Sequence, residues 1–333
     1  MTAPPLVEIR NLKVYFGVRG KRMLQKARGY VRAVDDVTLT VRRGETLGLV
    51  GESGSGKTTL GRAVLRALPV TAGGIRFHLE DGPVDVLALS GRELRRFRRH
   101  MQLIFQDPYA SLDPRMTVRD IIAEPLEAPG HLRSKREVDE RVREIAARCR
   151  LNLEFLRRFP HAFSGGQRQR IGIARALVAD PEFVVCDEAV SALDVSIQAD
   201  ILNLLMDLQE ELGTTYLFIT HDLSVVAQIS DRVAVLYLGR LMELGPTAEI
   251  FARPMHPYTR ALLSAIPRVE AEHRFAPVKL RGEIPDPAHP PQGCRFSTRC
   301  PFARERCREE VPAFRELARD RFAACHFAEE LAD

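Results

Sequence analysis

The segment Gly51-Glu-Ser-Gly-Ser-Gly-Lys-Thr-Thr59 fits the pattern G-x-x-x-x-G-K-[ST], with Gly51, Gly56, Lys57 and Thr58 in the four defining positions. The apolar run 46–50 before it predicts a buried strand, and residues 59–68 after it have helical spacing. Glycines let backbone N–H groups turn towards an anion, and the following helix presents its positive end to the same place. An ordinary glycine turn is the alternative, which the Lys-Thr pair and the flanking elements disfavour.

The side chains of this segment predict how a nucleotide would be held. We expect Lys57 to reach the terminal phosphates and the Thr58 hydroxyl to bind Mg²⁺. Ser53, Gly54 and Thr59 complete the predicted phosphate-binding loop.

The composition indicates an ordinary globular protein of one large or two moderate domains: 333 residues, 45% hydrophobic and 28% charged. The net charge of +5 is too small to indicate nucleic-acid binding. No apolar run reaches the roughly 18 residues that a membrane-spanning helix needs, and the first residues lack a secretory signal pattern. We therefore expect a soluble cytosolic chain that forms no disulfides, so any membrane role must come through partners.

Three predicted strands end in polar side chains. The runs 101–106, 183–186 and 214–220 end in Gln106, in Asp187 and Glu188, and before His221, respectively. Open α/β sheets bind ligands at these strand ends. Asp187 could hold Mg²⁺ through water and Glu188 could act as a general base. Gln106 could ligate the metal or sense the γ-phosphate, although an isolated Gln or His at a strand end is more often structural.

The region from about 116 to 180 has helical patterns. Ser134 and Glu137 form a capping box before an amphipathic stretch, and Ser164-Gly165-Gly166-Gln167 precedes another helix at 171–179. The Ser164 hydroxyl and the N–H groups of the two glycines predict a second anion site. Shorter apolar runs at 6–16, 33–41, 75–79 and 84–89 predict strands.

Two neighbouring aromatic residues lie just before a glycine in the N-terminal strand region. Phe16 could stack on adenine, with Tyr15 as the second candidate. The alternative is that both rings pack at the edge of a sheet.

Taken together, these motifs resemble the ATP-binding subunits of ABC transporters over about residues 6–250. The Ser164-Gly-Gly-Gln167 signature distinguishes this family from other phosphate-loop ATPases, and Ser191-Ala-Leu-Asp194 follows in the family's order. Phe163 stands where the family more often has Leu, and Ala189-Val190 stand where Pro-Thr is commoner. The resemblance implies a phosphate-loop NTPase fold of the ABC ATPase class: a RecA-like mixed sheet, an antiparallel β-subdomain and a helical subdomain at about 107–180.

The resemblance also implies a head-to-tail dimer with two ATP molecules at the interface, each between one subunit's loop and the other's Ser164 signature. In this scheme Glu188 activates water, His221 contacts the γ-phosphate and Gln106 links the metal to the membrane subunits. Asp194 passes information between the sites.

The C-terminal part looks like the ATPases of oligopeptide and dipeptide importers, including their nickel-transporting relatives. The segments that carry this resemblance are Tyr237-Leu-Gly-Arg240, Glu243-Leu-Gly-Pro246, His256-Pro-Tyr-Thr259, Ala265-Ile-Pro267 and Gly282-Glu-Ile-Pro285. We expect a nucleotide-binding domain at 1–250 and a C-terminal domain at 251–333. The expected function is ATP hydrolysis that powers peptide import.

The resemblance implies several partners: two transmembrane permease subunits, a sister ATPase (a heterodimer, or a homodimer as the alternative) and an extracytoplasmic substrate-binding protein. The chain would act at the cytoplasmic face of the inner membrane. Alternatives are an importer ATPase for nickel or another small solute, an ABC ATPase without a transport role, and a tail that works as a redox or metal sensor.

Four of the six cysteines stand in the last forty residues as Cys294-x5-Cys300-x6-Cys307-x17-Cys325. Four thiolates suit a [4Fe–4S] cluster or a tetrahedral Zn²⁺ site. The absence of a Cys-x-x-Cys pair favours the cluster, which some members of this subfamily are thought to carry. Four reduced cysteines that serve only packing remain the alternative.

Overall fold

A computed structural model of the chain describes residues 4–18, 29–127, 134–266, 280 and 282–331. These residues divide into two compact units, each assembled from segments that are far apart in the sequence. The first unit comprises the described residues up to Val7 together with 41–45 and 77–219, and the second those of 8–40, 46–76 and 220–333.

The first unit contains a parallel sheet of three strands, in the order β8-β7-β6. They are β6 (Met101–Ile104), β7 (Phe183–Asp187) and β8 (Thr215–Ile219), and every residue of β7 and β8 is buried. In the register, Ile104 lies opposite Cys186, and Asp187 lies opposite Ile219. The carboxyl ends of these strands therefore meet at one edge, as the sequence predicts for Gln106, Asp187 and Glu188.

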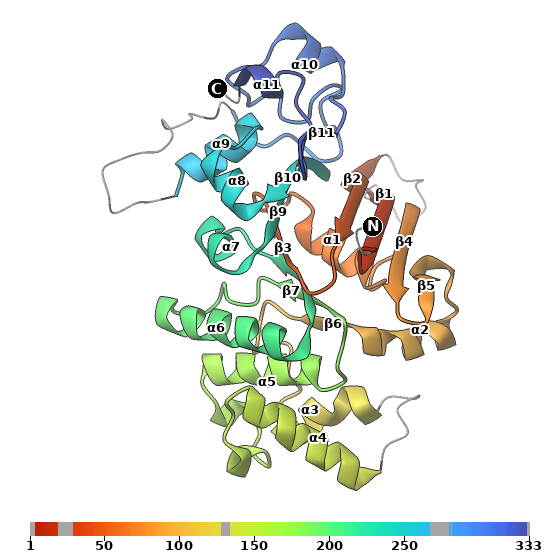
Figure 1. Ribbon diagram of the computed structural model, residues 1–333, viewed down its shortest axis with the longest axis vertical. Coiled ribbons are helices and arrows are strands. Elements are labelled where there is room, and N and C mark those ends of the chain that lie inside the picture. Colours follow the sequence, from red (N-terminus) through yellow and green to blue (C-terminus); the bar gives the residue numbers. More distant parts are fainter. Residues whose placement is uncertain (1–3, 19–28, 128–133, 267–279, 281, 332–333) are drawn as a thin grey trace. The chain divides into compact units, whose positions relative to one another are not determined.

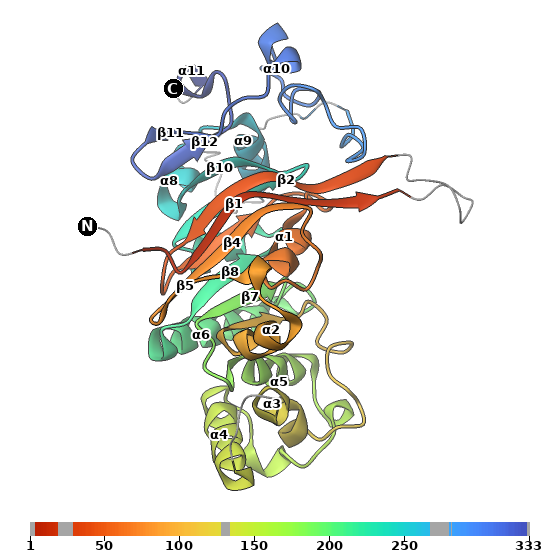
Figure 2. The same ribbon diagram turned by 90° about the vertical axis from the view of Figure 1, so that its right-hand side faces the viewer.

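Helices make up most of the remainder of this unit, and α3, α4 and α5 pack together (Figure 2). The amphipathic pattern of α4 is confirmed, because Val138, Val142, Ile145 and Ala146 are buried, and the Ser134–Glu137 capping box forms. The helices are α2 (Gly91–Phe97), α3 (Val118–Glu127), α4 (Lys135–Arg148), α5 (Gly165–Leu177) and α6 (Val195–Leu212).

The strand predicted at 84–89 is only partly correct. Strand β5 (Gly82–Asp85) ends early, because the Asp85 carboxylate accepts a hydrogen bond from the N–H of Leu87 at 2.9 Å. This contact caps a 3₁₀ turn at Val86–Ala88. An aspartate that bonds two residues ahead favours a turn over a continued strand.

The second unit contains a mixed sheet in the order β11-β12-β10-β9-β3. Strands β3 (Thr46–Val50) and β9 (Arg232–Tyr237) pair in parallel. The other pairs are antiparallel and join β9 to β10 (Arg240–Pro246), β10 to β12 (Arg321–Ala323) and β12 to β11 (Arg315–Ala318). The C-terminal strands thus extend the sheet that contains β3, the strand before the predicted phosphate loop (Figure 1).

The same unit holds β1 (Val7–Gly17), β2 (Tyr30–Val41) and the start of β4 (Ala72–Leu79), with sheet order β2-β1-β4. Its helices are α1 (Lys57–Val64), α7 (Leu223–Ile229), α8 (Thr247–Ala252), α9 (Pro257–Ser264), α10 (Glu305–Glu309) and α11 (Ala328–Leu331). One buried cluster connects Val50, at the end of β3, with Tyr237, Tyr258, Phe296 and Cys294. The cysteine segment is therefore part of the core that supports the loop.

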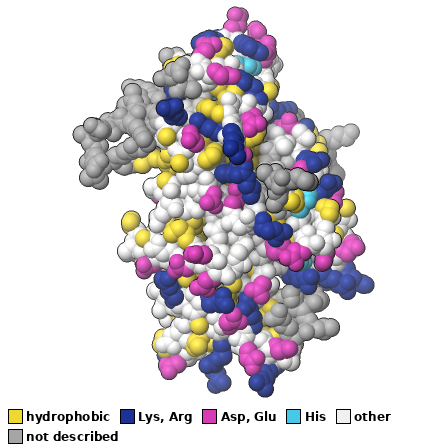
Figure 3. Space-filling view, in the orientation of Figure 1, with side chains coloured by type: hydrophobic (Ala, Val, Ile, Leu, Met, Phe, Trp, Pro, Cys, Tyr) yellow, Lys and Arg dark blue, Asp and Glu magenta, His cyan; other side chains and the backbone are white. Residues whose placement is uncertain are grey.

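Basic and acidic side chains are interspersed over the face shown in Figure 3. In the described ranges no helix combines the length and the hydrophobicity needed to cross a membrane.

Candidate functional site

The predicted phosphate loop of the second unit begins directly after β3 and ends at the start of α1. Gly51 has φ +152°, and an added Cβ would lie 2.1 Å from the Leu236 carbonyl oxygen. Gly56 has φ +106°, and its Cβ would lie 2.0 Å from the Ala33 carbonyl oxygen. Only glycine fits either position, because any larger residue would meet backbone atoms that cannot move aside.

The Lys57 ammonium lies beneath this loop. Its Nζ donates to the carbonyl oxygens of Gly51 at 2.8 Å and Glu52 at 2.9 Å, and to the Ser55 hydroxyl at 3.4 Å. The first turn of α1 contains no acidic residue, so no carboxylate of that turn offsets the positive end of the helix dipole. The loop can therefore receive an anion through backbone N–H groups, a buried cation and a helix terminus.

Ser53 and Gly54 are exposed at the tip of the loop, and Thr58 and Thr59 are partly buried in the first turn of α1. His221 is exposed and follows β8, just before Asp222 caps α7.

In the first unit, the structure brings Gln106 and Glu188 into contact. The Gln106 amide nitrogen donates to a Glu188 carboxylate oxygen at 2.6 Å. Glu188 has φ +50°, and its N–H donates to the Ile219 carbonyl oxygen of β8 at 2.9 Å. This left-handed conformation turns the chain at the end of β7, directly after the buried Asp187.

The predicted signature lies at the start of α5. The Ser164 hydroxyl accepts from the N–H of Gln167 at 3.4 Å, and the Gln167 side chain accepts from the N–H of Ser164 at 3.0 Å. A Cβ on Gly166 would lie 2.6 Å from Ile197 of α6. The absence of a side chain at Gly166 therefore allows α5 and α6 to pack closely, while a Cβ on Gly165 would lie 3.6 Å from the Tyr109 hydroxyl and 3.7 Å from Leu193.

Asp194 occupies the N-cap of α6, but its side chain makes no capping hydrogen bond. Asp194 is exposed, and Val195 beside it is 85% exposed. This loop therefore presents both a carboxylate and an apolar side chain to solvent.

The structure separates the two aromatic candidates of β1. Phe16 is 38% exposed. The Tyr15 hydroxyl instead donates to the buried Asp35 at 2.5 Å, and burial together with this bond raises the pKa of Tyr15 to about 12. Phe16 is thus the ring with an open face, and Tyr15 supports the fold.

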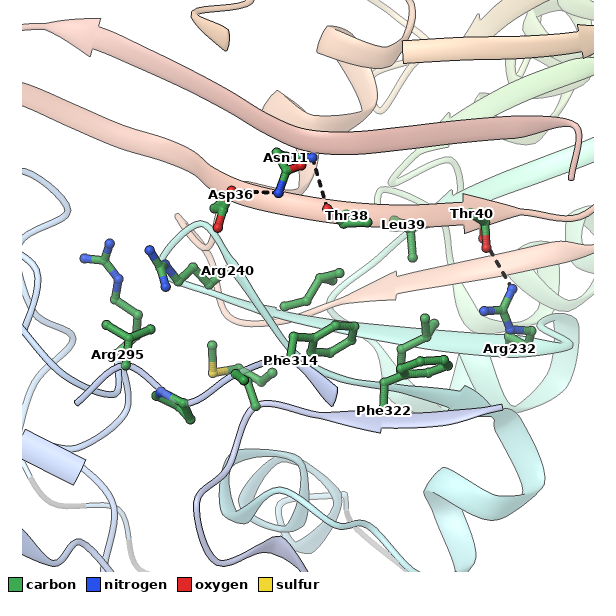
Figure 4. Close-up of a pocket in the computed structure, with 17 residues that line it drawn as sticks. Asn11, Asp36, Thr38, Leu39, Thr40, Arg232, Arg240, Arg295, Phe314 and Phe322 are labelled. Carbon is green, nitrogen blue, oxygen red and sulfur yellow. Dashed lines mark hydrogen bonds between the residues drawn. The ribbon is translucent and has the colours of Figure 1, made fainter. Parts of the chain in front are cut away.

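Asp35 also pairs with Arg240 at 3.3 Å and with Arg295. Arg240 and Arg295 lie at the end of a pocket of about 610 Å³ that also contains Asp36, and Arg232 lies near Thr40 at the other end (Figure 4). The Arg232 guanidinium donates to the Thr40 carbonyl oxygen at 3.3 Å. These contacts tie β2 to the C-terminal part of the unit.

Cys294, Cys300, Cys307 and Cys325 line one cavity, together with His256 and Phe296. Burial raises the pKa of Cys294 to about 12 and that of Cys300 to about 11, which favours the thiol form in the metal-free protein. Among the described residues, no group of three or more His, Cys, Asp or Glu side chains could hold a metal ion. Cys149 and Cys186 are buried in the first unit.

Comparisons with known proteins identify the family. The sequence model described as ABC transporter matches residues 34–191, and the model described as oligopeptide/dipeptide transporter, C-terminal region, matches residues 242–307. A putative peptide import ATP-binding protein of Brucella ovis is 53% identical over 98% of each chain. The chain belongs to the ABC transporter ATP-binding proteins of the oligopeptide/dipeptide type.

This ABC ATP-binding protein is also 50% identical to the oligopeptide transport ATP-binding protein AppF of Bacillus subtilis, over 96% of its own length and 97% of AppF. Its fold is similar to that of the ATP-binding cassette MJ0796, which is described as a dimer bound to ADP and Pi. The TM-score is 0.61 and the sequence identity 28%, and the match covers 72% of this chain and 98% of the MJ0796 chain. For cbiO1 of Clostridium perfringens the TM-score is 0.63, at 26% identity and coverage of 75% and 92%. The predicted family, ATPase activity and cassette fold are confirmed.

Proposed function

We propose that this protein is the ATP-hydrolysing subunit that powers import of di- and oligopeptides through a partner membrane permease. The observation that carries this proposal is the near full-length similarity to proteins named for peptide import, together with the match to the transporter C-terminal region. These relatives do not favour import of nickel or another solute, or an ABC ATPase without a transport role.

The proposed nucleotide site uses the motif residues in the roles that their chemistry suits. The loop from Gly51 to Thr59 binds the phosphates of ATP through its N–H groups and Lys57, and Phe16 stacks on adenine. Oxygen atoms of Thr58, Gln106 and Asp187 would hold Mg²⁺, which prefers hard oxygen donors and neutralises phosphate charge.

We propose that Glu188 is the general base for the attacking water and that His221 contacts the γ-phosphate. The 2.6 Å hydrogen bond from Gln106 supports this role for Glu188, because it orients the carboxylate at the end of β7. The same amide then offers its carbonyl oxygen as the metal ligand.

The working form that we propose is a head-to-tail dimer, in which the loop of one subunit faces Ser164, Gly165, Gly166 and Gln167 of the other. The exposure of Ser164 and Gln167 at the start of α5 and of Asp194 at the start of α6 supports it, since these polar side chains are accessible to a second subunit. A sister ATPase as the second subunit, two permease subunits and an extracytoplasmic binding protein complete the proposed assembly at the cytoplasmic face of the inner membrane. The domain boundary near residue 250 belongs to the same proposal.

A [4Fe–4S] cluster on Cys294, Cys300, Cys307 and Cys325, with Zn²⁺ as the alternative, is a separate proposal. Its support is that the four thiols line one cavity, although in the described residues they do not come together as a metal-binding group and would have to close around the cluster. A cluster bound there would cross-link the C-terminal segment. Anaerobic purification followed by analysis of iron, sulfide and zinc tests it. Protein that contains none of the three would refute both versions.

The variant Glu188→Gln tests the proposed site. Glutamine has nearly the same shape and can still accept the Gln106 hydrogen bond, so the fold and ATP binding should persist. The rate of ATP hydrolysis should fall by roughly 10²- to 10⁴-fold, the usual contribution of a general base. Size-exclusion chromatography with ATP should show a dimer that no longer dissociates.

The control is Glu211→Gln, which removes an exposed carboxylate on α6 and should leave turnover unchanged. Near-normal hydrolysis by Glu188→Gln would remove Glu188 from the role of base.

A further inference from the structure

Glu52, the second residue of the phosphate loop, is held from outside the loop. The Arg299 guanidinium binds both of its carboxylate oxygens, at 2.5 Å and 3.1 Å. The Tyr258 hydroxyl oxygen accepts a hydrogen bond from the Glu52 N–H at 2.9 Å. Both the backbone and the side chain of Glu52 are therefore fixed by residues more than 200 positions further along the chain.

These contacts are well shielded from water. The Arg299 side chain is 9% exposed and the Glu52 side chain 25% exposed. Tyr258 is fully buried, and its ring lies 4.6 Å from that of Tyr237, whose hydroxyl accepts from Arg299 at 3.4 Å. A bidentate Arg–carboxylate pair that is shielded from water is strong and directional, unlike an exposed ion pair.

Arg299 belongs to a turn that is fixed by backbone hydrogen bonds and by packing. The N–H groups of Arg299 and Cys300 both donate to the Phe296 carbonyl oxygen, at 3.0 Å and 2.9 Å. The fully buried Phe296 ring packs against Tyr237 and Tyr258, at centroid distances of 5.4 Å and 5.2 Å. The turn that carries Arg299 is thus part of the same core as the tyrosines that contact the loop.

We infer that Arg299 is a positioning residue for ATP binding: it holds Glu52 in place and neutralises a carboxylate that would otherwise face the phosphates. The inference rests on the proposed function, in which the loop from Gly51 to Thr59 binds ATP. Without Arg299, the loop would lose one anchor and would keep an unpaired negative charge beside a polyphosphate. Like charges at such distances repel more strongly where water is excluded.

Equilibrium dialysis of radiolabelled ATP against the full chain tests this inference. Arg299→Ala should raise the ATP Kd about 10-fold or more, because truncating one partner of a shielded pair leaves the other charge uncompensated. Glu52→Gln, which removes the repelling charge, should change Kd by less than about 3-fold. The double variant Arg299→Ala/Glu52→Gln should recover most of the lost affinity, to within about 3-fold of wild type.

Arg304→Ala is the matched control. It breaks an ion pair with Glu330 in the same segment, at 2.7 Å, in which both side chains are more than half exposed. Its ATP Kd should match that of wild type. Turnover of Arg299→Ala at saturating ATP should also stay near the wild-type value, because the change acts on binding.

Two results would overturn the inference: an unchanged Kd for Arg299→Ala, or a double variant that binds ATP as weakly as Arg299→Ala. The second result would show that Arg299 serves only the fold, and a lowered Tm of each variant that lacks Arg299 would then show the loss of stability. A wild-type protein that does not bind ATP would instead refute the proposed function itself.

Discussion

Replacing Asp35 by asparagine should destabilise the second unit far more than an ordinary surface change. Asp35 is 3% exposed and accepts hydrogen bonds from Tyr15, Arg240 and Arg295. The Arg295 side chain is only 4% exposed, so loss of the Asp35 charge leaves a buried guanidinium without its counter-ion. Removing one partner of a buried ion pair costs about 3 to 5 kcal/mol.

The lower end of that range applies here. Asparagine keeps an oxygen that can accept from Tyr15, and Arg240 is partly exposed, with 26% of its side chain accessible. We therefore expect the free energy of unfolding to fall by about 3 kcal/mol, and Tm by about 6 to 12 °C for a domain of this size. Urea unfolding followed by circular dichroism measures the first quantity and thermal melting the second.

The effect of pH provides an independent check. Burial alone would raise the pKa of Asp35, but the hydrogen bond from Tyr15 and the charges of Arg240 and Arg295 outweigh it and lower the pKa below its usual value. A lowered carboxyl pKa contributes stability above the unfolded value of about 3.9, and this contribution is lost as the pH falls through the folded value. The difference between wild type and Asp35→Asn should therefore stay constant from about pH 5 to 8.

The neighbouring Asp36→Asn is the matched control. Asp36 is exposed and has φ +65°, a conformation that asparagine tolerates well, so its cost should stay within about 0.5 kcal/mol. The double variant Asp35→Asn/Arg295→Met removes both charges and should recover part of the loss. A cost below about 1 kcal/mol for Asp35→Asn, or an equal cost for Asp36→Asn, would refute the buried-pair argument.

Two further predictions concern the nucleotide site. Gly56→Ala should abolish ATP binding and lower Tm, because its Cβ would lie 2.0 Å from the Ala33 carbonyl oxygen. Gly54→Ala adds only backbone strain at φ +76°, with no atom within 4 Å of its Cβ, and should reduce both clearly less. Equal losses for the two variants in dialysis and melting would contradict this. Phe16→Ala should raise the ATP Kd about 5- to 30-fold, because stacking on the adenine base is lost. Tyr15→Phe should lower Tm and leave the ATP Kd unchanged. The reverse pattern would make Tyr15 the stacking ring.

Much of the local structure around the site is predictable from short stretches of sequence. The loop after β3, the capping box at Ser134 and the helix that follows Ser164 each depend on residues within a few positions of one another. Backbone geometry, helix capping and hydrophobic spacing are local properties, so the sequence alone predicts these elements and the chemistry they carry. The strand at 84–89 was partly wrong because the local bond from Asp85 outweighed the apolar pattern.

The long-range pairs come only from the tertiary structure. Arg299 meets Glu52 across 247 positions and Arg295 meets Asp35 across 260, yet both arginines stand in one short cysteine-containing segment with no sequence signal for either partner. Likewise, nothing in the spacing predicts that Tyr15 supports the core while Phe16 stays exposed, or that β12 pairs with β10. Such contacts depend on which surfaces the folded core brings together. The charge and shape of a side chain limit the kinds of partner it can have, but only packing decides which distant residue becomes that partner.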